Sequence, residues 1–422
     1  MRCCQLSSHE SSALAALDLG SACPAHIAAA SPSSGISRAW ASARYLNSGM
    51  HPPAAELTVA GMECFDVVIV GARCAGAVTA MLLARAGLRV LVVERQDNGA
   101  DTLSGLMIKP DGVARLLSWG VLGDIRATGC PPITTAEIVI AGTAIAAPVA
   151  ADSFALAPRR TALDPVLQEH ARRAGAQIRF ATSFRDWDSG SAVLDQYQVR
   201  ARLLIGADGR GSRVARIVGS PFRVHRPRRS CAWYGFWDGC PLQGMRAELD
   251  DGIFAGVFPT NNRQVIAFVQ VPIARWRAGQ QGRDYLAGLH RAPSVHAALS
   301  GSRLASGTVG VRNLPSYIRH AGRADWALVG DAVHYKDPLA ARGIADAFLG
   351  AELLAHHVLT GWDGDLGEAL TAYDHDIRSA FAQPLELNDR LAQLSRPAGE
   401  VLDTWSRLAS WVYRAPRTTA SS

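Results

Sequence analysis

The sequence lacks the patterns that define several common classes of protein. Eight cysteines are present, but no two have the C-x-x-C spacing that a zinc or dithiol site needs. No uninterrupted run of about eighteen or more apolar residues occurs, so nothing indicates a membrane-spanning helix. A long cysteine-containing chain with no credible export signal is typical of a reducing compartment. We therefore expect no metal site, no stable insertion into a membrane and a cytoplasmic location.

A strong excess of charge is also lacking. The 43 basic residues and 37 acidic residues leave a formal net charge of +6, a surplus that can serve an anionic cofactor or substrate. No recognition module accompanies it, so we expect a small-molecule substrate and no nucleic acid partner. The densest basic run, Arg223 to Arg229, is interpreted as a solvated linker between sheets and not as a binding stripe. The oligomeric state stays open.

The chain is long enough for two associated domains or one large one, with 422 residues of which 48% are hydrophobic. Residues 1–61 are rich in Ala and Ser and have no sustained apolar period. We expect them to be a disordered tail, or an extension from a start codon assigned too early, with Met62 as the functional start. A transit peptide is the weaker alternative.

A strand, a glycine-bearing turn and a helix follow. Phe65 to Val70 is a β-branched apolar run typical of a buried strand, and Gly71–Gly76 then opens a helix that ends near Gly87. A second strand ends in Glu94, about as far from the glycines as the acid of a dinucleotide-binding unit. Such a turn presents free N–H groups and the helix dipole to a pyrophosphate. Arg73 stands where a middle glycine is usual, so an ordinary tight turn is the alternative.

Two later segments repeat the passage from an apolar strand into a glycine turn. Ala201 to Ile205 leads to Asp208-Gly209, and a helix-like stretch with Ser212 near its start follows. A plain hairpin turn is the alternative there. Trp326 to Val329 leads to Gly330-Asp331, and a long helical pattern begins at Gly343. For this third turn the alternative is a helix cap without a ligand.

From Phe65 to about Leu394 the chain resembles the FAD-dependent oxidoreductase superfamily of aromatic hydroxylases (group A flavin monooxygenases), flavin halogenases and geranylgeranyl-type reductases. The resemblance is closest to a poorly characterised bacterial branch, through Gly71–Gly76, Asp101–Ser104 and Lys336–Pro338. It implies an α/β fold, in which a Rossmann-like FAD-binding domain of the three-layer glutathione-reductase type carries an inserted antiparallel-sheet substrate domain and C-terminal helices. The predicted parts are an FAD-binding domain at 62–220 and 305–360, a substrate-covering β-sheet domain at 221–304 and a C-terminal helical segment at 361–422.

The resemblance assigns roles at the third turn. It implies that Asp331 hydrogen-bonds the ribityl chain, that Pro338 lies against the ring, and that N–H groups of Gly343 and Ile344 stabilise negative charge on the reduced flavin. Pro338 and His334 are the flavin-proximal candidates, although a structural role for His334 is favoured. The predicted cofactor-binding residues are Gly71, Arg73, Cys74, Ala75, Gly76, Glu94, Arg95, Arg160, Asp208, Gly209, Gly330, Asp331, Pro338, Gly343 and Ile344.

Some features leave alternatives open. Lys336 is interpreted as solvent-exposed or as a charge on the phosphate side, and Arg160 as a cofactor contact or a plain surface residue. Three strand-like runs, Cys231 to Phe236, Gly252 to Phe258 and Gln264 to Val271, predict a sheet over the flavin. Its aromatic residues, Trp233, Tyr234, Trp237 and Phe258, favour an aromatic or lipophilic substrate, or are sheet core.

The function that the resemblance implies is an NAD(P)H-dependent monooxygenase that hydroxylates or epoxidises a small molecule through a C4a-hydroperoxyflavin. No second glycine-rich turn is found, so NAD(P)H is expected as a transient co-substrate and FAD as the cofactor. The alternatives are a double-bond reductase of the geranylgeranyl reductase type and a non-catalytic flavin-binding protein. Halogenation is less favoured, because no Trp-x-Trp-x-Ile-Pro segment occurs.

Overall fold

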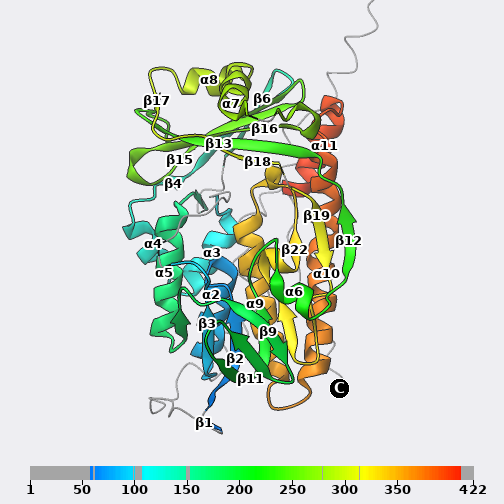
Figure 1. The fold of residues 1–422 in the computed structure, drawn as a ribbon. Coiled ribbons are helices and arrows are strands. Elements are labelled where there is room, and N and C mark those ends of the chain that lie inside the picture. Colours follow the sequence, from blue (N-terminus) through cyan, green and yellow to red (C-terminus); the bar gives the residue numbers. More distant parts are fainter. Residues whose placement is uncertain are drawn as a thin grey trace, which may run out of the picture.

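The structure is a computed structural model that describes residues 58–59, 62–97, 99, 107–148, 153–277, 279–312 and 314–409. The predictions for the N-terminal extension, apart from 58–59, and for Asp101–Ser104 lie outside the described residues. A parallel sheet with its helices forms one half of the molecule, a second sheet lies across its end, and two C-terminal helices run along the side of both (Figure 1). This arrangement matches the mixed α/β class that the sequence predicts.

The first sheet is built from the buried, β-branched runs. Its spatial order is β20-β21-β11-β2-β3-β8, and β2, β3, β8, β11 and β21 run parallel. Gly206, the last residue of β11, lies opposite Val70 on one side and Leu328 on the other. The three strands therefore end at one edge. The strands are β1 (Thr58–Val59), β2 (Met62–Val70), β3 (Val90–Val93), β8 (Gln177–Arg179), β9 (Phe184–Asp188), β10 (Ser191–Leu194), β11 (Gln198–Gly206), β20 (Gly322–Arg323) and β21 (Trp326–Leu328).

Helices α5 and α9 both pack against α2 beside this sheet. Eleven of the twelve residues of α2, all but Arg85, are Ala, Gly, Val, Leu, Met, Cys or Thr, and all eleven are buried. Gly87, with φ +92°, ends α2 where the sequence predicts a left-handed cap. The helices of this part are α2 (Cys74–Arg85), α3 (Pro110–Ser118), α4 (Leu122–Ala127), α5 (Arg160–Arg173), α6 (Arg213–Ile217) and α9 (Gly343–Gly361).

The second sheet contains the three strands predicted from the sequence and adds others. Its order is β17-β13-β16-β15-β14-β5-β6, with β18 also paired to β13. β5 and β6 come from residues 135–148, far before the predicted insertion, and the β5–β14 pair is parallel in a sheet expected to be antiparallel. The strands are β5 (Thr135–Ile140), β6 (Thr143–Pro148), β13 (Ser230–Asp238), β14 (Met245–Asp250), β15 (Ile253–Pro259), β16 (Val265–Pro272), β17 (Arg303–Leu304) and β18 (Val309–Val311).

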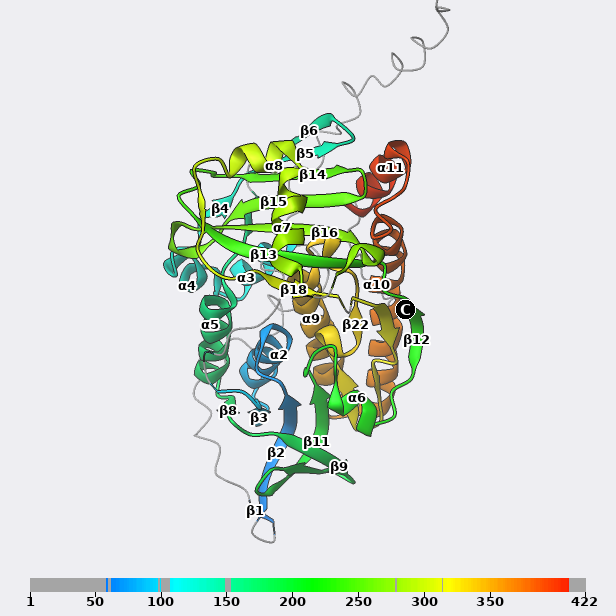
Figure 2. The same cartoon turned by 45° about the horizontal axis from the view of Figure 1, so that its top comes forward.

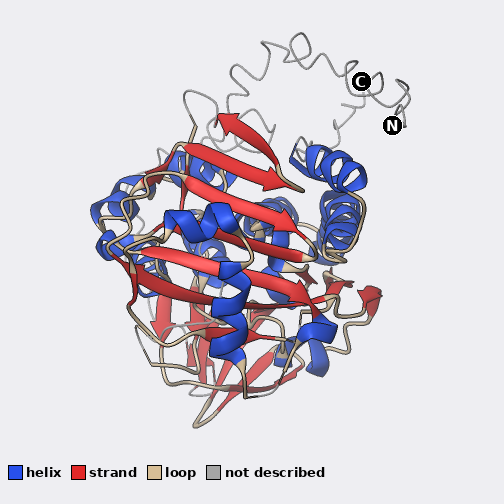
Figure 3. Ribbon diagram, turned by 90° about the horizontal axis from the view of Figure 1, so that it is seen from above, coloured by secondary structure: helices blue, strands red, loops and turns tan. Residues whose placement is uncertain are grey.

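Alternation along β13 divides the aromatic residues between the two faces of this sheet. Trp233 and Trp237 belong to the outer face, which α7 (Gln281–His290) and α8 (Pro293–Ala298) cover (Figure 3). Tyr234 and Phe258 belong to the inner face, which looks toward the parallel sheet. Trp233 stacks on Trp276 in the outer core, so the sheet-core alternative applies to Trp233.

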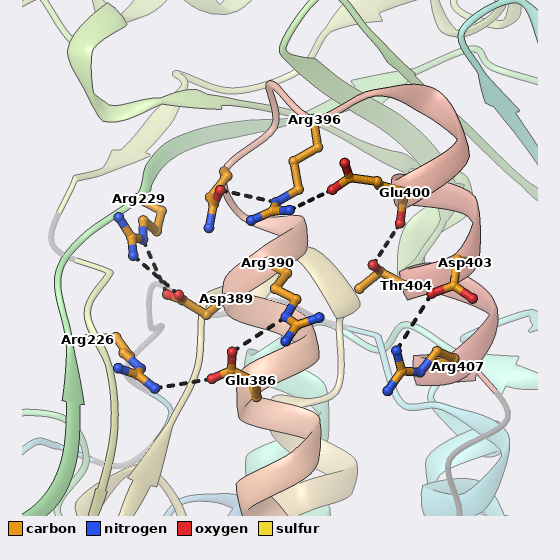
Figure 4. Close-up of polar contacts among 11 residues, drawn as sticks. Arg226, Arg229, Glu386, Asp389, Arg390, Arg396, Glu400, Asp403, Thr404 and Arg407 are labelled. Atoms are coloured by element: carbon orange, nitrogen blue, oxygen red, sulfur yellow. Dashed lines mark hydrogen bonds and ion pairs between the residues drawn. The ribbon is translucent and has the colours of Figure 1, made fainter.

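The basic run lies along the edge of the molecule as β12 (Phe222–Arg226) and the residues after it, which connect the two halves. Arg226 pairs with Glu386, and Arg229 with Asp389, both on α10 (Leu366–Leu391) (Figure 4). These cations therefore fasten the segment to a helix, which the interpretation as a solvated linker did not include. The remaining elements are α11 (Ala398–Ala409), β4 (Pro132–Ile133), β7 (Ala155–Leu156), β19 (Ser316–Arg319), β22 (His334–Tyr335), η2 (Asn261–Arg263), η3 (Ile273–Arg275), η4 (Gly330–Ala332) and η5 (Pro338–Ala340).

Candidate functional site

The three glycine-bearing turns meet at one edge of the parallel sheet, on the side that faces the second sheet (Figure 2). A Cβ atom on Gly71 would lie 2.5 Å from the carbonyl oxygen of Ala207, beside the second turn. A Cβ atom on Gly330 would lie 2.7 Å from the Cβ atom of Ala75, in the first turn. Both glycines also have positive φ, +104° and +62°. Only glycine allows three turns this close together.

The first turn is held by Glu94. One carboxylate oxygen accepts a hydrogen bond from the Ala72 N–H at 3.0 Å, and the other accepts one from the Gln96 N–H at 3.1 Å. Gln96 in turn accepts a hydrogen bond from the Arg73 guanidinium. Glu94 therefore ties the end of β3 to the start of α2.

A small pocket, open to solvent, lies beside this turn. One face of α5 contributes Arg160, Asp164 and Gln168, which are spaced four residues apart. Arg160 and Asp164 form a bidentate pair with distances of 2.9 and 3.0 Å, and Gln168 Nε2 donates to the Ala72 carbonyl oxygen at 2.9 Å. The pocket is lined by Arg73, Glu94, Gln96, Asp97, Gly99, Arg160, Asp164, Pro165, Gln168 and Phe180.

Cys74, the first residue of α2, lies behind this pocket. Its Sγ atom is 3.5 Å from Asp164 Oδ1, and burial raises the pKa of the thiol to about 12. A protonated, buried thiol donates to the Asp164 carboxylate and is a poor nucleophile. Cys74 therefore packs the α2–α5 contact.

Asp208 caps the helix after the second turn. Its Oδ2 atom accepts hydrogen bonds from the N–H groups of Arg213 at 2.6 Å and Val214 at 3.1 Å, while Ser212 caps Ala215. Helix α6 thus starts where the sequence predicts it. Asp208 Oδ1 is buried and has no hydrogen-bond partner among the described residues. A buried carboxylate oxygen without a partner is costly, so this atom favours a bound donor.

The second and third turns are joined by Tyr317 on β19. Its hydroxyl group donates to the Asp331 carbonyl oxygen at 2.6 Å and lies 3.4 Å from the Arg210 carbonyl oxygen. Burial raises the pKa of the Asp331 carboxyl to about 6, while Arg210 and Arg160 act in the opposite direction. The guanidinium groups of Arg210, in the second turn, and of Arg160, on α5, thus both act on the charge of Asp331.

The loop before α9 is fixed by buried ion pairs. Lys336 pairs with Asp346, and Arg342 bridges Asp346 at 3.3 Å and Asp111 at 2.8 Å. The interpretation of Lys336 as solvent-exposed or phosphate-side is therefore wrong, because its side chain is only 4% exposed and its ammonium group meets a carboxylate. By contrast, Gly343 at the start of α9 is exposed and faces open space. A planar group can therefore approach the first N–H groups of α9.

His334 has a structural environment. Its ring stacks on Phe381 with centroids 4.1 Å apart and an angle of 8° between the planes. Burial, together with nearby Lys336, lowers the pKa of His334 to about 3. The imidazole is therefore neutral at physiological pH and cannot act there as a proton donor in its charged form.

Asp337 connects the third turn to the second sheet. Its carboxylate accepts hydrogen bonds from Ser230 on β13 and from Gln270 on β16, both at 2.5 Å. Its carbonyl oxygen accepts one from Asn388 on α10 at 2.8 Å. Pro338, the next residue, is thereby held between the sheet and the turn.

The inner face of the second sheet lies over this loop. Phe236, Phe258 and Ile266 form a buried apolar cluster with Met107, and Ala341 packs against the same cluster. The residues nearest the third turn therefore meet an apolar, largely aromatic surface. Such a surface suits an aromatic or lipophilic ligand.

The structure brings most of the predicted site residues to one edge, and it also identifies residues that the sequence reasoning missed. Arg95 is exposed and does not line the pocket. Asp164 and Gln168 are two of the missed residues, although their four-residue spacing from Arg160 is a local signal that they share a helix face with it. Tyr317 had no such local signal. Among the described residues, no three His, Cys, Asp or Glu side chains are placed to hold a metal ion, and no helix combines the length and apolar character needed to cross a membrane.

The site fits a dinucleotide. The first turn of α2 contains no acidic residue that would compete with an anion for its N–H groups and dipole. Gly76 leaves no room for a side chain, since a Cβ atom would lie 1.8 Å from the Gly71 carbonyl oxygen. Gln168 Oε1, which belongs to the pocket lining, is buried without a partner among the described residues. These features match an anionic, hydroxyl-rich ligand.

The parallel sheet, the helix start and the three turns define an α/β dinucleotide-binding protein with a second sheet beside the site. The chain belongs to the FAD binding domain family, whose model matches residues 64–388. It is accordingly an FAD-dependent oxidoreductase.

Relatives of known name cover most of the chain. It is 23% identical to a digeranylgeranylglycerophospholipid reductase of Methanocella arvoryzae over 78% of this chain and 87% of that protein. It is 26% identical to the ubiquinone hydroxylase UbiL of Rhodospirillum rubrum over 81% of this chain and 85% of that protein. Among solved structures, the flavin-dependent brominase Bmp2 superposes with a TM-score of 0.71 at 17% identity, covering 81% and 89% of the two chains. At that identity the likeness shows the fold.

Proposed function

We propose that the protein is an NAD(P)H-dependent monooxygenase that hydroxylates or epoxidises an aromatic or lipophilic small molecule. The observation that carries the proposal is the aromatic inner face of the second sheet, with Phe236 and Phe258, which packs against Ala341 beside the start of α9. A ligand between these surfaces would meet the flavin ring and an apolar wall together. UbiL, a relative over most of the chain, is named as a hydroxylase of ubiquinone.

The residues at the three turns would hold FAD. Glu94 and the pocket beside Arg160 would take the ribose and the adenine side, and the N–H groups at the start of α2 would take the pyrophosphate. Asp208 Oδ1 and the Asp331 carboxylate would accept hydrogen bonds from hydroxyl groups of the cofactor. Arg95, being exposed, would contribute least.

Bound FAD would accept reducing equivalents from NAD(P)H and activate dioxygen for transfer of one oxygen atom. The chain itself would supply charge stabilisation and exclusion of water. The N–H groups of Gly343 and Ile344 would stabilise the negative charge that reduction places on the ring, as a helix start does for an anion. The apolar face of the second sheet would keep water away from the reacting atoms. His334 would position the loop as a neutral ring.

A spectroscopic and an oxygen measurement test this function together. The purified protein should show the visible absorption of bound FAD, and anaerobic NADH or NADPH should bleach it. Readmission of air should restore the colour with consumption of oxygen, faster when an aromatic compound such as a naphthol is present. A colourless protein that takes up no added FAD contradicts the cofactor assignment.

A double-bond reductase is the second candidate, because the digeranylgeranylglycerophospholipid reductase relative covers 78% of the chain. A reductase would oxidise NAD(P)H in proportion to the prenyl substrate that it reduces, and it would do so in the absence of oxygen. Oxygen uptake coupled to NAD(P)H oxidation and product formation distinguishes the monooxygenase.

A further inference from the structure

Arg159 lies at the junction of the FAD site and the inner face of the second sheet. It is the residue before α5, next to Arg160, which pairs with Asp164 beside the pocket. The Arg159 N–H donates to Asn261 Oδ1 at 2.8 Å, in the connection between β15 and β16. The backbone of this arginine is therefore fixed to the second sheet, while its neighbour faces the cofactor pocket.

The side chain of Arg159 is held against the sheet. Its guanidinium carbon lies 4.0 Å from the centroid of the Phe236 ring, and Nη1 donates to Gln264 Oε1 at 3.2 Å. Gln264 is itself oriented by Asp238, to which it donates at 2.9 Å. The guanidinium group thus has one preferred position, at the edge of the apolar cluster that contains Phe236.

This guanidinium group has no carboxylate counter-ion among the described residues. Asp238, the acid beyond Gln264, instead pairs with Arg303 at 3.0 Å. Arg159 Nε is buried and has no hydrogen-bond partner among the described residues. A buried N–H of a charged group without an acceptor is costly and favours a bound anion.

We propose that Arg159 binds an oxyanion, a carboxylate or a phosphate, of a ligand whose apolar body lies on the inner face of the second sheet. The Phe236 ring under the guanidinium places the charged group and the apolar surface in contact, so one molecule can reach both. Arginine suits this role because its planar fork donates to two oxygens of such a group. The inference rests on the proposed function only for placing the ligand body beside the flavin.

Calorimetric titration with three naphthalene probes tests the assignment on the purified full chain. 2-Naphthoate carries a carboxylate, 1-naphthyl phosphate carries a phosphate, and 2-naphthamide is neutral. At least one of the two anions should bind about tenfold or more tightly than the amide, as expected for a charge-assisted hydrogen bond in a partly buried site. The anion that gains affinity identifies the source of the oxyanion.

Two variants separate recognition from packing. Arg159→Gln should remove the preference for the anion while leaving the affinity for the amide, and Arg159→Lys should restore part of it. Arg263→Gln is the matched control, because Arg263 is exposed in the same β15–β16 connection. That variant should keep the full preference. Thermal midpoints show whether each variant folds.

The outcomes decide the assignment without reference to the redox chemistry. If neither anion binds more tightly than the amide, or if Arg159→Gln keeps the full preference, Arg159 is not an anion-binding residue. The visible spectrum of the same sample reports FAD. A preference for the anion in a protein without FAD would retain the Arg159 site and contradict the proposed function.

Discussion

The hydroxyl group of Tyr317 reaches the carbonyl oxygen of Asp331 at 2.6 Å and so connects two turns that are separated by more than a hundred residues. Tyr317 is not among the residues that the sequence patterns predict to bind the cofactor. Its position beside Arg210 and Asp331 nevertheless sets the spacing between the second and third turns. The geometry of the candidate site thus depends on a residue outside the motifs.

Replacement of Tyr317 by Phe should weaken FAD binding while the protein stays folded. Loss of one hydrogen bond of this kind costs about 1 kcal/mol, so the dissociation constant of FAD should rise about fivefold. Titration of the apoprotein with FAD, followed by flavin fluorescence, measures the change.

Tyr285→Phe provides the matched control. The Tyr285 hydroxyl also donates to a carbonyl oxygen, that of Ala267 at 3.1 Å, but Tyr285 belongs to α7 and is buried in the core on the outer face of the second sheet. This variant should lower the thermal midpoint and leave the affinity for FAD unchanged. Equal losses of affinity in both variants would show that Tyr317 acts through general stability.

Replacement of Gly76 by Val should abolish retention of FAD. A Cβ atom at this position would lie 1.8 Å from the Gly71 carbonyl oxygen, so the first turn must move away from the start of α2. The absorbance ratio of flavin to protein after gel filtration measures retention, and circular dichroism reports the fold. Gly123→Val, at an exposed helix position with open space, should retain the flavin. Full flavin absorbance in Gly76→Val would refute the placement of this turn.

Local sequence patterns predict the part of the site that depends on parallel strands. Three apolar runs, each ending in a glycine turn, belong to β2, β11 and β21, and parallel strands bring their carboxyl ends to one edge. The helix starts after Gly71 and Ser212 follow from the same local signals. This is why the order and the meeting of the turns could be predicted.

Contacts made by distant residues could not be predicted in this way. β5 pairs with β14 across more than a hundred residues, and nothing in the alternation of Thr135–Ile140 specifies which sheet it joins. A lysine in a loop is usually exposed, so no local pattern predicts that Lys336 is buried against Asp346. Side-chain partners of this kind depend on the tertiary path of the chain.

The raised pKa of Asp331 predicts a pH dependence of stability in the apoprotein. Burial raises this pKa from 3.8 to about 6, so the unfolded state loses its proton first as the pH rises. The contribution of Asp331 to stability is therefore full below about pH 3.8, and it is lost as the pH rises until the folded carboxyl has also ionised, above about pH 6. The loss corresponds to about 3 kcal/mol at most.

Asp331→Asn isolates this contribution, because the amide resembles the protonated acid in shape but does not ionise. Urea unfolding of the wild-type apoprotein and of the variant at pH 4.5 and 7.5 gives the comparison. The variant should gain stability relative to wild type at the higher pH only. An equal difference at the two pH values would show that Asp331 has an ordinary pKa. Asp337, whose pKa is also raised to about 6, is present in both proteins and cancels.

Removal of one partner from the buried Lys336–Asp346 pair should be more damaging than removal of both. Lys336→Met leaves Asp346 buried with Arg342, at 3.3 Å, as its one remaining ion-pair partner among the described residues, and should cost about 3 kcal/mol or more in the free energy of unfolding. In the double variant Lys336→Met, Asp346→Leu, Arg342 keeps Asp111 at 2.8 Å, so much of that loss should be recovered. Urea unfolding measures both.

The exposed pair Asp403–Arg407 on α11, visible in Figure 4, is the control, because it shows how much free energy of unfolding is lost with an ion pair that is not buried. Arg407→Met should cost less than about 1 kcal/mol, because solvent screens both charges. If Lys336→Met costs no more than Arg407→Met, water reaches the Lys336 site and the ion pairs do not fix the loop before α9. If the single variant is strongly destabilised and the double variant is not, the damage comes from an uncompensated buried carboxylate. The ion pair would then serve to hold the loop that presents Gly343 to the cofactor.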